Sequence, residues 1–414
     1  MAVTPAARVV TVGVPPTGAL LDPDGAAVAA ALEAAGVPVA MRVFVDDDET
    51  ALEQALASAV ALTVVLAGDG GSAGDVVRRV VARLAGTRLV LNDRMLAALE
   101  EHYRRGDRPL PRRAERLALL PQGASVWLVD HGEPGWAVDA GGRAFIVLPR
   151  GGPLAPALRQ QLTDYVADHV PARGTVAVRT LRTAGVSLAA LEDRLAAWIG
   201  REGGVAVSVV PAAGEVWVRL RARGQTPSAA AEAVERAETE IRGLLGPDCF
   251  GRDEETLEQA VARRLLARGL TLSVAESCTG GLLGHRLTSV PGSSRYFERG
   301  VLVYSNEAKQ EMLGVPEVIL RAHGAVSAPC AEAMARGIAE RSRTACGLSI
   351  TGIAGPDGGT PTKPVGTVFI GLATPGHLAA RHFLFSGDRA AVKWQSTQMA
   401  LDMLRRALEE DSTP

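Results

Sequence analysis

The chain has 414 residues, more than one hydrophobic core usually supports, so two or three domains are expected. Apolar residues make up 47% and charged residues 22% of the chain, a composition that excludes a disordered protein. A formal net charge of −2 excludes bulk electrostatic attraction to nucleic acid or to anionic membranes.

The first 168 residues alternate between predicted strands and helices. Apolar runs predict strands at 8–14, 37–45, 61–67 and 143–149. Helical patterns fill the intervals, at 25–36, 49–59, 75–85 and 154–168. Alternation of this kind is typical of a parallel sheet covered by helices. We therefore expect a three-layer α/β domain over residues 1–168.

The order of elements changes in the middle of the chain. Residues 175–181 predict a strand, 188–200 a helix, 205–210 and 215–221 two strands, and 227–245 a helix. This order indicates a small α+β module over residues 169–250.

The last part of the chain, residues 251–414, returns to alternating strands and helices. Strands are predicted near 270–275, 299–304, 347–352, 366–373 and 379–385, and a helix over 388–410. The pattern predicts a second three-layer α/β domain.

Neither a targeting segment nor a membrane span is predicted. The N-terminus lacks a basic region followed by an apolar core, and no apolar run approaches the roughly 18 residues that span lipid. The spacing of the four cysteines matches neither a metal site nor a disulfide scaffold, so reduced thiols are expected. We therefore expect a cytoplasmic protein without membrane contact.

The sequence LSVAESCTGG at 272–281 is the densest chemical signal. Ser277 follows an apolar strand and Glu276, and a glycine pair, Gly280 and Gly281, opens a helix. Backbone amides near Thr279, Gly280 and Gly281 are candidates to bind an oxyanion or a phosphate, and Glu276 is a candidate substrate contact. The alternative is an ordinary turn in which Ser277 caps the helix.

A second strand ends in GVLVYSNEAK at 300–309. Asn306 is the expected N-cap of the helix that follows, which places Lys309 in the first helical turn. There the helix dipole lowers the pKa of the amine, as a catalytic base requires. Only three of the 44 basic residues are lysines, which makes each lysine a candidate, although a surface role for Lys309 stays open.

The segment ITGIAGPDGGTPTKPVGTV at 350–368 joins two predicted strands by a loop rich in glycine and proline. Asp357, Thr360 and Lys363 supply polar groups at its rim, and Thr351, Gly352 and Asp357 are candidate substrate contacts. Arg389, farther along, can bind a phosphate with two parallel hydrogen bonds, or pair at the surface. A loop without a ligand is the alternative.

These motifs, together with PGSSRYFERGVLVYSNEAK and HGAVS, make residues 251–410 resemble the C-terminal domain of the CinA (competence/damage-inducible protein A) family. The resemblance implies deamidation of nicotinamide mononucleotide by a serine–lysine mechanism in pyridine nucleotide salvage. It assigns Ser277 as nucleophile and Lys309 as base, with Tyr304 assisting. No metal or other cofactor is implied for this reaction. Cys278 is the rival nucleophile, because a thiolate is intrinsically more reactive than a hydroxyl.

The first domain resembles the family's molybdopterin-binding-like domain, which in some members hydrolyses the pyrophosphate of ADP-ribose. The motifs that should hold a divalent metal are degenerate here. They read Gly13-Val14-Pro15, Pro23-Asp24-Gly25 and AGDGGS at 67–72, and of a later aspartate pair only Asp75 remains. Too few oxygen ligands remain for a metal-dependent pyrophosphatase, so we expect a catalytically silent domain, and a divalent metal only if this domain is active.

The middle module resembles the KH-like domain of full-length family members. It lacks the Gly-x-x-Gly loop with flanking basic residues that clamps a nucleic-acid backbone, so nucleic-acid binding is not expected. The resemblance also implies a homodimer. Two alternatives stay open: an enzyme that also hydrolyses ADP-ribose, and a non-enzymatic partner in competence or DNA damage.

Overall fold

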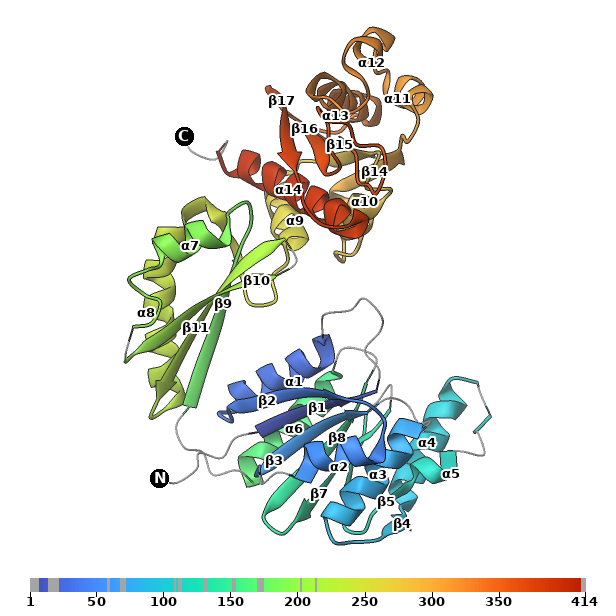
Figure 1. The fold of residues 1–414 in the computed structure, drawn as a ribbon, viewed down its shortest axis with the longest axis vertical. Coiled ribbons are helices and arrows are strands. Elements are labelled where there is room, and N and C mark those ends of the chain that lie inside the picture. The colour runs from blue at the N-terminus through green and yellow to red at the C-terminus, as the bar shows by residue number, and fades with distance from the viewer. Residues whose placement is uncertain are drawn as a thin grey trace. The chain divides into compact units, whose positions relative to one another are not determined.

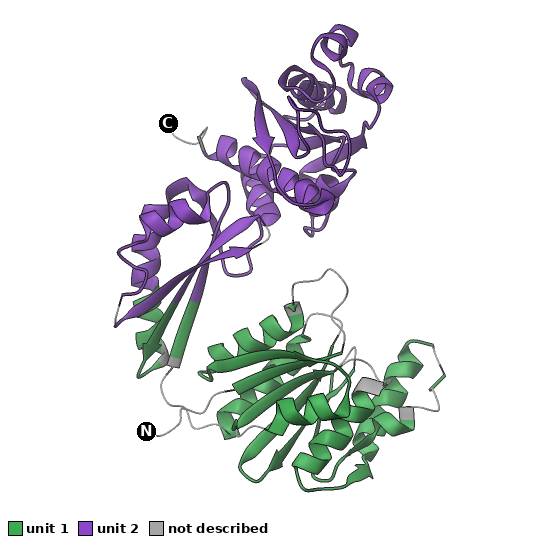
Figure 2. Ribbon diagram, viewed as in Figure 1, with its two compact units in different colours: residues 1–178, 221–234 green, residues 179–220, 235–414 purple. Residues whose placement is uncertain are grey.

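The computed structural model describes residues 7–13, 22–57, 60–67, 72–107, 109–110, 114–129, 133–150, 154–169, 175–201, 203–212 and 214–410. The chain divides into two compact units, which Figure 2 distinguishes. One unit contains residues 1–178 and 221–234, and the other 179–220 and 235–414. In the described residues, no helix is both long enough and apolar enough to cross a bilayer.

The N-terminal domain is built on a six-stranded sheet. Its strand order is β2 (Val39–Val45), β1 (Ala7–Val12), β3 (Leu62–Ala67), β8 (Arg143–Pro149), β7 (Gly135–Ala140) and β6 (Ser125–Trp127). The first four strands are parallel, but β7 and β6 are antiparallel additions at one edge. The four strands that the sequence predicted are thus parallel, as expected, whereas the antiparallel strands β7 and β6 were not predicted.

Helices cover both faces of this sheet and make the three layers that the sequence predicted (Figure 1). One core lies beneath α2 (Glu49–Ala57), α3 (Ser72–Leu84), α4 (Asp93–Arg105) and α5 (Ala114–Leu117). The other lies beneath α1 (Pro23–Ala34) and α6 (Pro156–His169). A separate two-stranded ribbon consists of β4 (Leu89–Leu91) and β5 (Leu119–Pro121).

The middle module has a four-stranded sheet in the order β10 (Val205–Ala212), β11 (Glu215–Gly224), β9 (Thr175–Thr183) and β12 (Cys249–Arg252). Its helices are α7 (Leu188–Arg194) and α8 (Pro227–Leu245), followed by the short 3-10 helix η1 (Gly246–Asp248). Burial alternates along β11, as expected of a sheet with one covered face. Helix α7 is shorter than the predicted 188–200, since the chain turns at Leu195 and Ile199 bridges to Val207.

The C-terminal domain contains a five-stranded sheet. Its order is β14 (Phe297–Leu302), β13 (Leu272–Glu276), β15 (Cys346–Gly352), β16 (Thr367–Thr374) and β17 (His377–Leu384). Strands β14, β13 and β15 are parallel, whereas β16 and β17 run antiparallel. Because parallel strands end at the same edge, the segments after β13, β14 and β15 converge there.

Helices cover both faces of this sheet as well (Figure 1). Helix α13 (Ala328–Ser342) packs on one face, near α11 (Asn306–Leu313) and α12 (Glu317–His323). The other face is covered by α9 (Leu257–Arg268), α10 (Leu282–Thr288) and α14 (Arg389–Glu410). A short 3-10 helix, η2 (Ser293–Arg295), precedes β14. The domain thus has the expected three-layer form.

Candidate active site

Ser277 lies in the turn that directly follows β13. Its backbone amide donates to the carbonyl oxygen of Ile350 in β15, at 3.0 Å, which extends the sheet by one residue. The amide of Gly280 then donates back to Ser277 O at 3.2 Å. Gly280 and Gly281 have φ values of +62° and +93°, which a side chain would strain, so the glycine pair is required to make this turn.

Glu276 caps helix α10 with its side chain. The carboxylate accepts hydrogen bonds from the amides of Gly281 at 3.1 Å, Leu283 at 3.1 Å and Gly284 at 2.8 Å. These amides are otherwise unpaired at a helix start, and the helix dipole favours a negative charge there. Glu276 therefore has a structural role at the start of α10, and its contact with substrate stays a prediction. Ser277 is not the cap, so that alternative for the serine was wrong.

Lys309 brings its side chain to Ser277 from the neighbouring strand end. Its Nζ atom lies 3.3 Å from Ser277 Oγ, as well as 2.7 Å from the carbonyl oxygen of Val303 and 3.2 Å from that of Tyr304. A neutral amine can donate its two hydrogens to the two carbonyls and direct its lone pair at the serine hydroxyl. The geometry therefore suits proton transfer from Ser277 to Lys309.

The surroundings of Lys309 favour the neutral amine. The side chain is 1% exposed, and burial lowers its pKa below the ordinary lysine value. The thiols of Cys330 and Cys278 and the carboxylate of Glu307 oppose this lowering of the pKa, but burial has the larger effect. In the part of the chain that the structure describes, no carboxylate forms an ion pair with Lys309. Among the described residues the acceptors around this nitrogen are Ser277 Oγ and backbone carbonyl oxygens, including that of Ser305 at 3.4 Å, so a positive charge on it has no anionic partner at hydrogen-bond distance.

Cys278 lies next to the serine but in a different environment. Burial raises the pKa of its thiol to about 11, so the thiolate is scarce at neutral pH. The side chain belongs to the hydrophobic core formed by α9, α14 and the sheet. The structure thus disfavours Cys278 as the rival nucleophile.

The turn before Lys309 differs in detail from the prediction. Ser305 is the N-cap of α11, since its hydroxyl accepts from the Ala308 amide at 3.0 Å, and Asn306 is the exposed first residue of the helix. Tyr304 is 69% exposed, and its hydroxyl accepts a hydrogen bond from Arg389 at 3.4 Å. Because Ser277 and Lys309 are in direct contact, no phenol lies between them.

Thr279 is the candidate for an oxyanion contact. Among the described residues, neither its amide nor its fully buried hydroxyl has a hydrogen-bond partner. The amides of Gly280 and Gly281 are already used, by Ser277 O and by Glu276. Thr279 is 0% exposed, so its unpaired donors lie inside the turn, two residues from the nucleophile.

Two cations lie at the rim of the site, at the start of α14. Arg389 donates to the carbonyl oxygen of Gly355 at 2.7 Å and to Tyr304. Lys393 lies beside Gly280, because a Cβ atom placed there would be 3.6 Å from Lys393 Nζ. Both residues line an open pocket of about 880 Å³ that also contains Leu282 and Trp394. The scarcity of lysine made Lys393 a candidate in the sequence, but sequence reasoning gave it no place in the site.

The glycine-rich loop between β15 and β16 is held in place by Lys363. Its Nζ donates to the carbonyl oxygens of His323 at 3.1 Å and Val326 at 2.7 Å. Thr351 donates its hydroxyl to Ala325 O at 2.9 Å, and Asp357 lies exposed on the loop. These contacts tie the loop to the HGAVS segment at 323–327.

Gly352 has a packing role at the end of β15. A Cβ atom there would lie 2.7 Å from Val368 and 2.8 Å from the carbonyl oxygen of Thr367. Such contacts are shorter than the protein could accommodate without shifting β16. The close approach of the two strands thus explains this glycine without a ligand.

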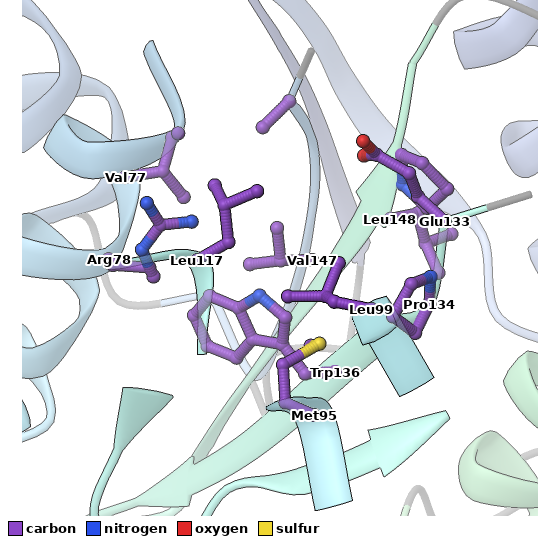
Figure 3. Close-up of a pocket in the computed structure, with 13 residues that line it drawn as sticks. Val77, Arg78, Met95, Leu99, Leu117, Glu133, Pro134, Trp136, Val147 and Leu148 are labelled. Carbon is purple, nitrogen blue, oxygen red and sulfur yellow. The ribbon is translucent and has the colours of Figure 1, made fainter. Parts of the chain in front are cut away.

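The degenerate motifs of the N-terminal domain are described only in part. Val14, Pro15 and residues 68–71 lie outside the described residues. Asp75, the remaining motif aspartate, forms an ion pair with Arg78, which is only 7% exposed. Figure 3 shows Arg78 at a pocket walled by Met95, Leu99 and other apolar side chains.

This pocket has a volume of about 50 Å³. Pockets for drug-sized ligands usually have roughly 300–1,000 Å³. Among the described residues, no three His, Cys, Asp or Glu side chains gather as they would around a metal ion. The ion pair of Asp75 also leaves its carboxylate less available as a metal ligand.

Comparisons with known proteins match all three parts of the chain. Residues 7–168 match the model of a probable molybdopterin binding domain, 178–251 the damage-inducible protein CinA KH domain, and 254–408 the CinA C-terminal domain. A CinA-like protein of Gemmatimonas aurantiaca is 37% identical over 406 residues, covering 95% of this chain and 94% of that protein. A putative competence-damage inducible protein of Symbiobacterium thermophilum is 38% identical, covering 94% and 96%.

Among solved structures, a competence/damage inducible protein from Agrobacterium tumefaciens is 39% identical. It covers 37% of this chain and 97% of its own length, with a TM-score of 0.35.

Proposed function

The chain belongs to the CinA family, and we propose that its last domain hydrolyses nicotinamide mononucleotide to nicotinate mononucleotide and ammonia. The observation that carries this proposal is the contact at 3.3 Å between Ser277 Oγ and the buried Nζ of Lys309. A hydroxyl beside a buried amine without a carboxylate partner is the arrangement that a serine–lysine amidohydrolase needs.

The first half of the reaction forms an ester between enzyme and substrate. Neutral Lys309 accepts the proton of Ser277 as Oγ attacks the amide carbon of the nicotinamide ring. The resulting ammonium then returns that proton to the amide nitrogen as the carbon–nitrogen bond breaks, and ammonia leaves. The nicotinoyl group remains attached to Ser277, and Lys309 is neutral again.

The second half hydrolyses this ester. Lys309 accepts a proton from a water molecule, whose oxygen attacks the ester carbon, and then returns the proton to Ser277 Oγ as the ester bond breaks. The product is nicotinate mononucleotide, with the phosphoribosyl group unchanged. In both halves a negative charge develops on the carbonyl oxygen, and the free amide of Thr279 is the group that we assign to bind it.

The charges at the rim suit the other end of this substrate. Arg389 and Lys393 provide two positive charges beside the nucleophile turn, and a guanidinium can bind phosphate through two parallel hydrogen bonds. The exposed ring of Trp394 adds an apolar surface to the same pocket. A nucleoside monophosphate with an amide on its ring would use both parts of the site.

The test is an ammonia-release assay on the full chain, with mass spectrometry of the nucleotide product. We expect nicotinamide mononucleotide to give equal amounts of ammonia and nicotinate mononucleotide without added metal. A trapped ester on Ser277, seen after rapid acid quench, would support the covalent step. A wild-type protein that releases no ammonia from this substrate contradicts the proposal and favours the non-enzymatic alternative.

A further inference from the structure

The pocket beside α14 has a wall that comes from the middle module. Gly214, in the turn between β10 and β11, lines it together with Lys393 and Trp394. A Cβ atom on Gly214 would lie 3.5 Å from Cδ1 of Trp394, which is van der Waals contact distance. Gly214 and α14 belong to the same compact unit (Figure 2), so this wall is part of one folded body.

Glu215, the next residue, anchors this turn to α14. Its Oε1 accepts a hydrogen bond from Gln398 at 2.8 Å. Its Oε2 accepts from Arg182 at 2.8 Å and from Trp217 Nε1 at 2.7 Å. The Glu215 side chain is 8% exposed, so these charge-assisted bonds are shielded from water and fix the turn firmly.

The same contacts continue to the aromatic wall of the pocket. Gln398 Oε1 accepts from Arg286 at 2.5 Å, and the Arg286 guanidinium lies 4.2 Å from the ring centroid of Trp394. Arg286 is buried, and its position is set further by Glu258 and Thr397. The middle module thus forms one wall of the pocket with Gly214. Through the contacts of Glu215 with Gln398 and of Gln398 with Arg286, it also supports Trp394, which forms another wall.

The chemistry of the pocket indicates which part of a ligand it takes. Arg389 and Lys393 are opposed by a single acid, Asp388, whose Oδ1 already accepts from the Ala391 amide at 2.8 Å. The remaining positive charge suits an anion. Because Leu282 and Lys393 lie beside the Ser277 turn, an anionic group here would be attached to a substrate whose other end reaches the nucleophile.

We propose that Gly214 of the middle module forms one wall of the subsite for the phosphoribosyl end of the substrate and determines how well that end fits. The identity of the reacting end rests on the proposed function, but the subsite itself does not. The module then acts in substrate binding as well as in linking the two larger domains.

The test measures binding of ribose 5-phosphate to the full chain by calorimetry, and KM and kcat for nicotinamide mononucleotide. A Gly214→Leu variant places a side chain in the pocket, so we expect ribose 5-phosphate to bind at least about tenfold more weakly. KM should rise by a similar factor with kcat nearly unchanged, because Ser277 and Lys309 are untouched. A merely structural defect would instead lower kcat, because a smaller fraction of the protein would be correctly folded and active.

Gly204→Leu is the matched control. Gly204 has φ +80°, close to the +85° of Gly214, but no atom lies within 4 Å of the position of its Cβ. Gly204→Leu therefore introduces the same backbone strain outside the pocket. Its binding of ribose 5-phosphate should equal that of wild type. If Gly214→Leu fails to fold, Gly214→Ala adds only a methyl group at ordinary contact distance and should show a smaller shift in KM.

The outcomes distinguish the proposed deamidation from the proposed subsite. Ribose 5-phosphate binding that depends on Gly214, without release of ammonia, would overturn the proposed reaction and support the subsite. Turnover of nicotinamide mononucleotide with no effect of either Gly214 variant, or with no measurable binding of ribose 5-phosphate to wild type, would overturn the subsite.

Discussion

Lys309 Nζ lies 3.3 Å from Ser277 Oγ, although 32 residues separate the two in the chain. The contact exists because β13 and β14 are parallel neighbours and end at the same edge of the sheet. In the described residues Lys309 has no acidic partner, so its charge state depends mainly on burial. The lowered pKa of Lys309 can therefore be tested through the pH dependence of both catalysis and stability.

Replacement of the serine and its neighbouring cysteine separates the two nucleophile candidates. Ser277→Ala should lower kcat for nicotinamide mononucleotide by roughly 10⁴-fold or more, because the covalent step is lost. Cys278→Ala should keep kcat within about threefold of wild type, since it removes only a buried thiol that packs in the core. Steady-state ammonia release from both variants is the measurement. An active Ser277→Ala together with an inactive Cys278→Ala would reverse the assignment.

Alkylation tests the reactivity of the buried thiols independently of mutation. The pKa of Cys278 and that of Cys330 are both raised to about 11 by burial. At pH 7.5 the reactive thiolate is therefore a very small fraction of either residue. Iodoacetamide should leave the activity intact over an hour at this pH, with both cysteines unlabelled in peptide mass spectra. Rapid inactivation that substrate prevents would show a reactive thiol in the site.

The pH dependence of kcat should report the charge of Lys309. Only the neutral amine accepts a proton, so activity should rise with pH through the pKa of Lys309 in the folded protein. Because burial lowers that pKa, the rise should occur below the ordinary lysine value of about 10.4. Lys309→Arg, whose guanidinium stays charged, should be inactive at every pH tested. A pH-independent kcat from pH 6 to 10 would argue against lysine as the base.

The same pKa makes a prediction about stability. Between the folded pKa of Lys309 and its higher unfolded value, the unfolded chain binds one more proton than the folded chain. The free energy of unfolding therefore rises with pH across this window. The melting temperature of wild type should increase relative to that of Lys309→Met as pH rises toward 10. A constant difference between the two would mean that the pKa of Lys309 is not lowered by folding.

The sequence predicted the parallel strands of both α/β domains and singled out Ser277 and Lys309, which the structure brings into contact, because apolar periodicity and motif spacing are local signals. The three amides that Glu276 accepts from lie five to eight residues ahead of it, and nothing in the sequence distinguishes this cap from a substrate contact. The N-cap of α11 is Ser305, one residue before the predicted Asn306, because serine and asparagine are equally good N-cap residues. The antiparallel edge of β7 and β6, and the place of Gly214 beside Trp394, depend on tertiary packing alone.

Removal of the Glu276 carboxylate should affect folding more than substrate binding. Glu276→Ala leaves three amides at the start of α10 without their acceptor, and we expect the free energy of unfolding to fall by about 2–4 kcal/mol. Glu276→Gln keeps one oxygen as acceptor and should lose about half as much. Urea unfolding followed by circular dichroism measures both. At low temperature, where each variant is folded, KM should stay within about twofold of wild type, and a large rise in KM with unchanged stability would restore the substrate role.

The ion pair between Asp75 and Arg78 leads to a prediction for the N-terminal domain. Arg78 is nearly buried, and burial lowers its pKa while Asp75 holds it charged, so the two side chains depend on each other. We expect no hydrolysis of ADP-ribose with Mg²⁺ or Mn²⁺, measured as AMP release by the same preparation that releases ammonia from nicotinamide mononucleotide. Asp75→Asn should leave ammonia release unchanged but lower the free energy of unfolding by about 1–2 kcal/mol, because a buried guanidinium loses its anion.

The control for this variant is Asp46→Asn. Asp46 is exposed and lies outside helix and strand, and among the described residues its carboxylate accepts only from the neighbouring Asp47 amide, so its loss should be nearly neutral. Metal-dependent release of AMP that Asp75→Asn abolishes and Asp46→Asn preserves would show instead that the carboxylate leaves Arg78 to bind a cation. The N-terminal domain would then be a second catalytic centre, and the loss of its other motif residues would need a different explanation.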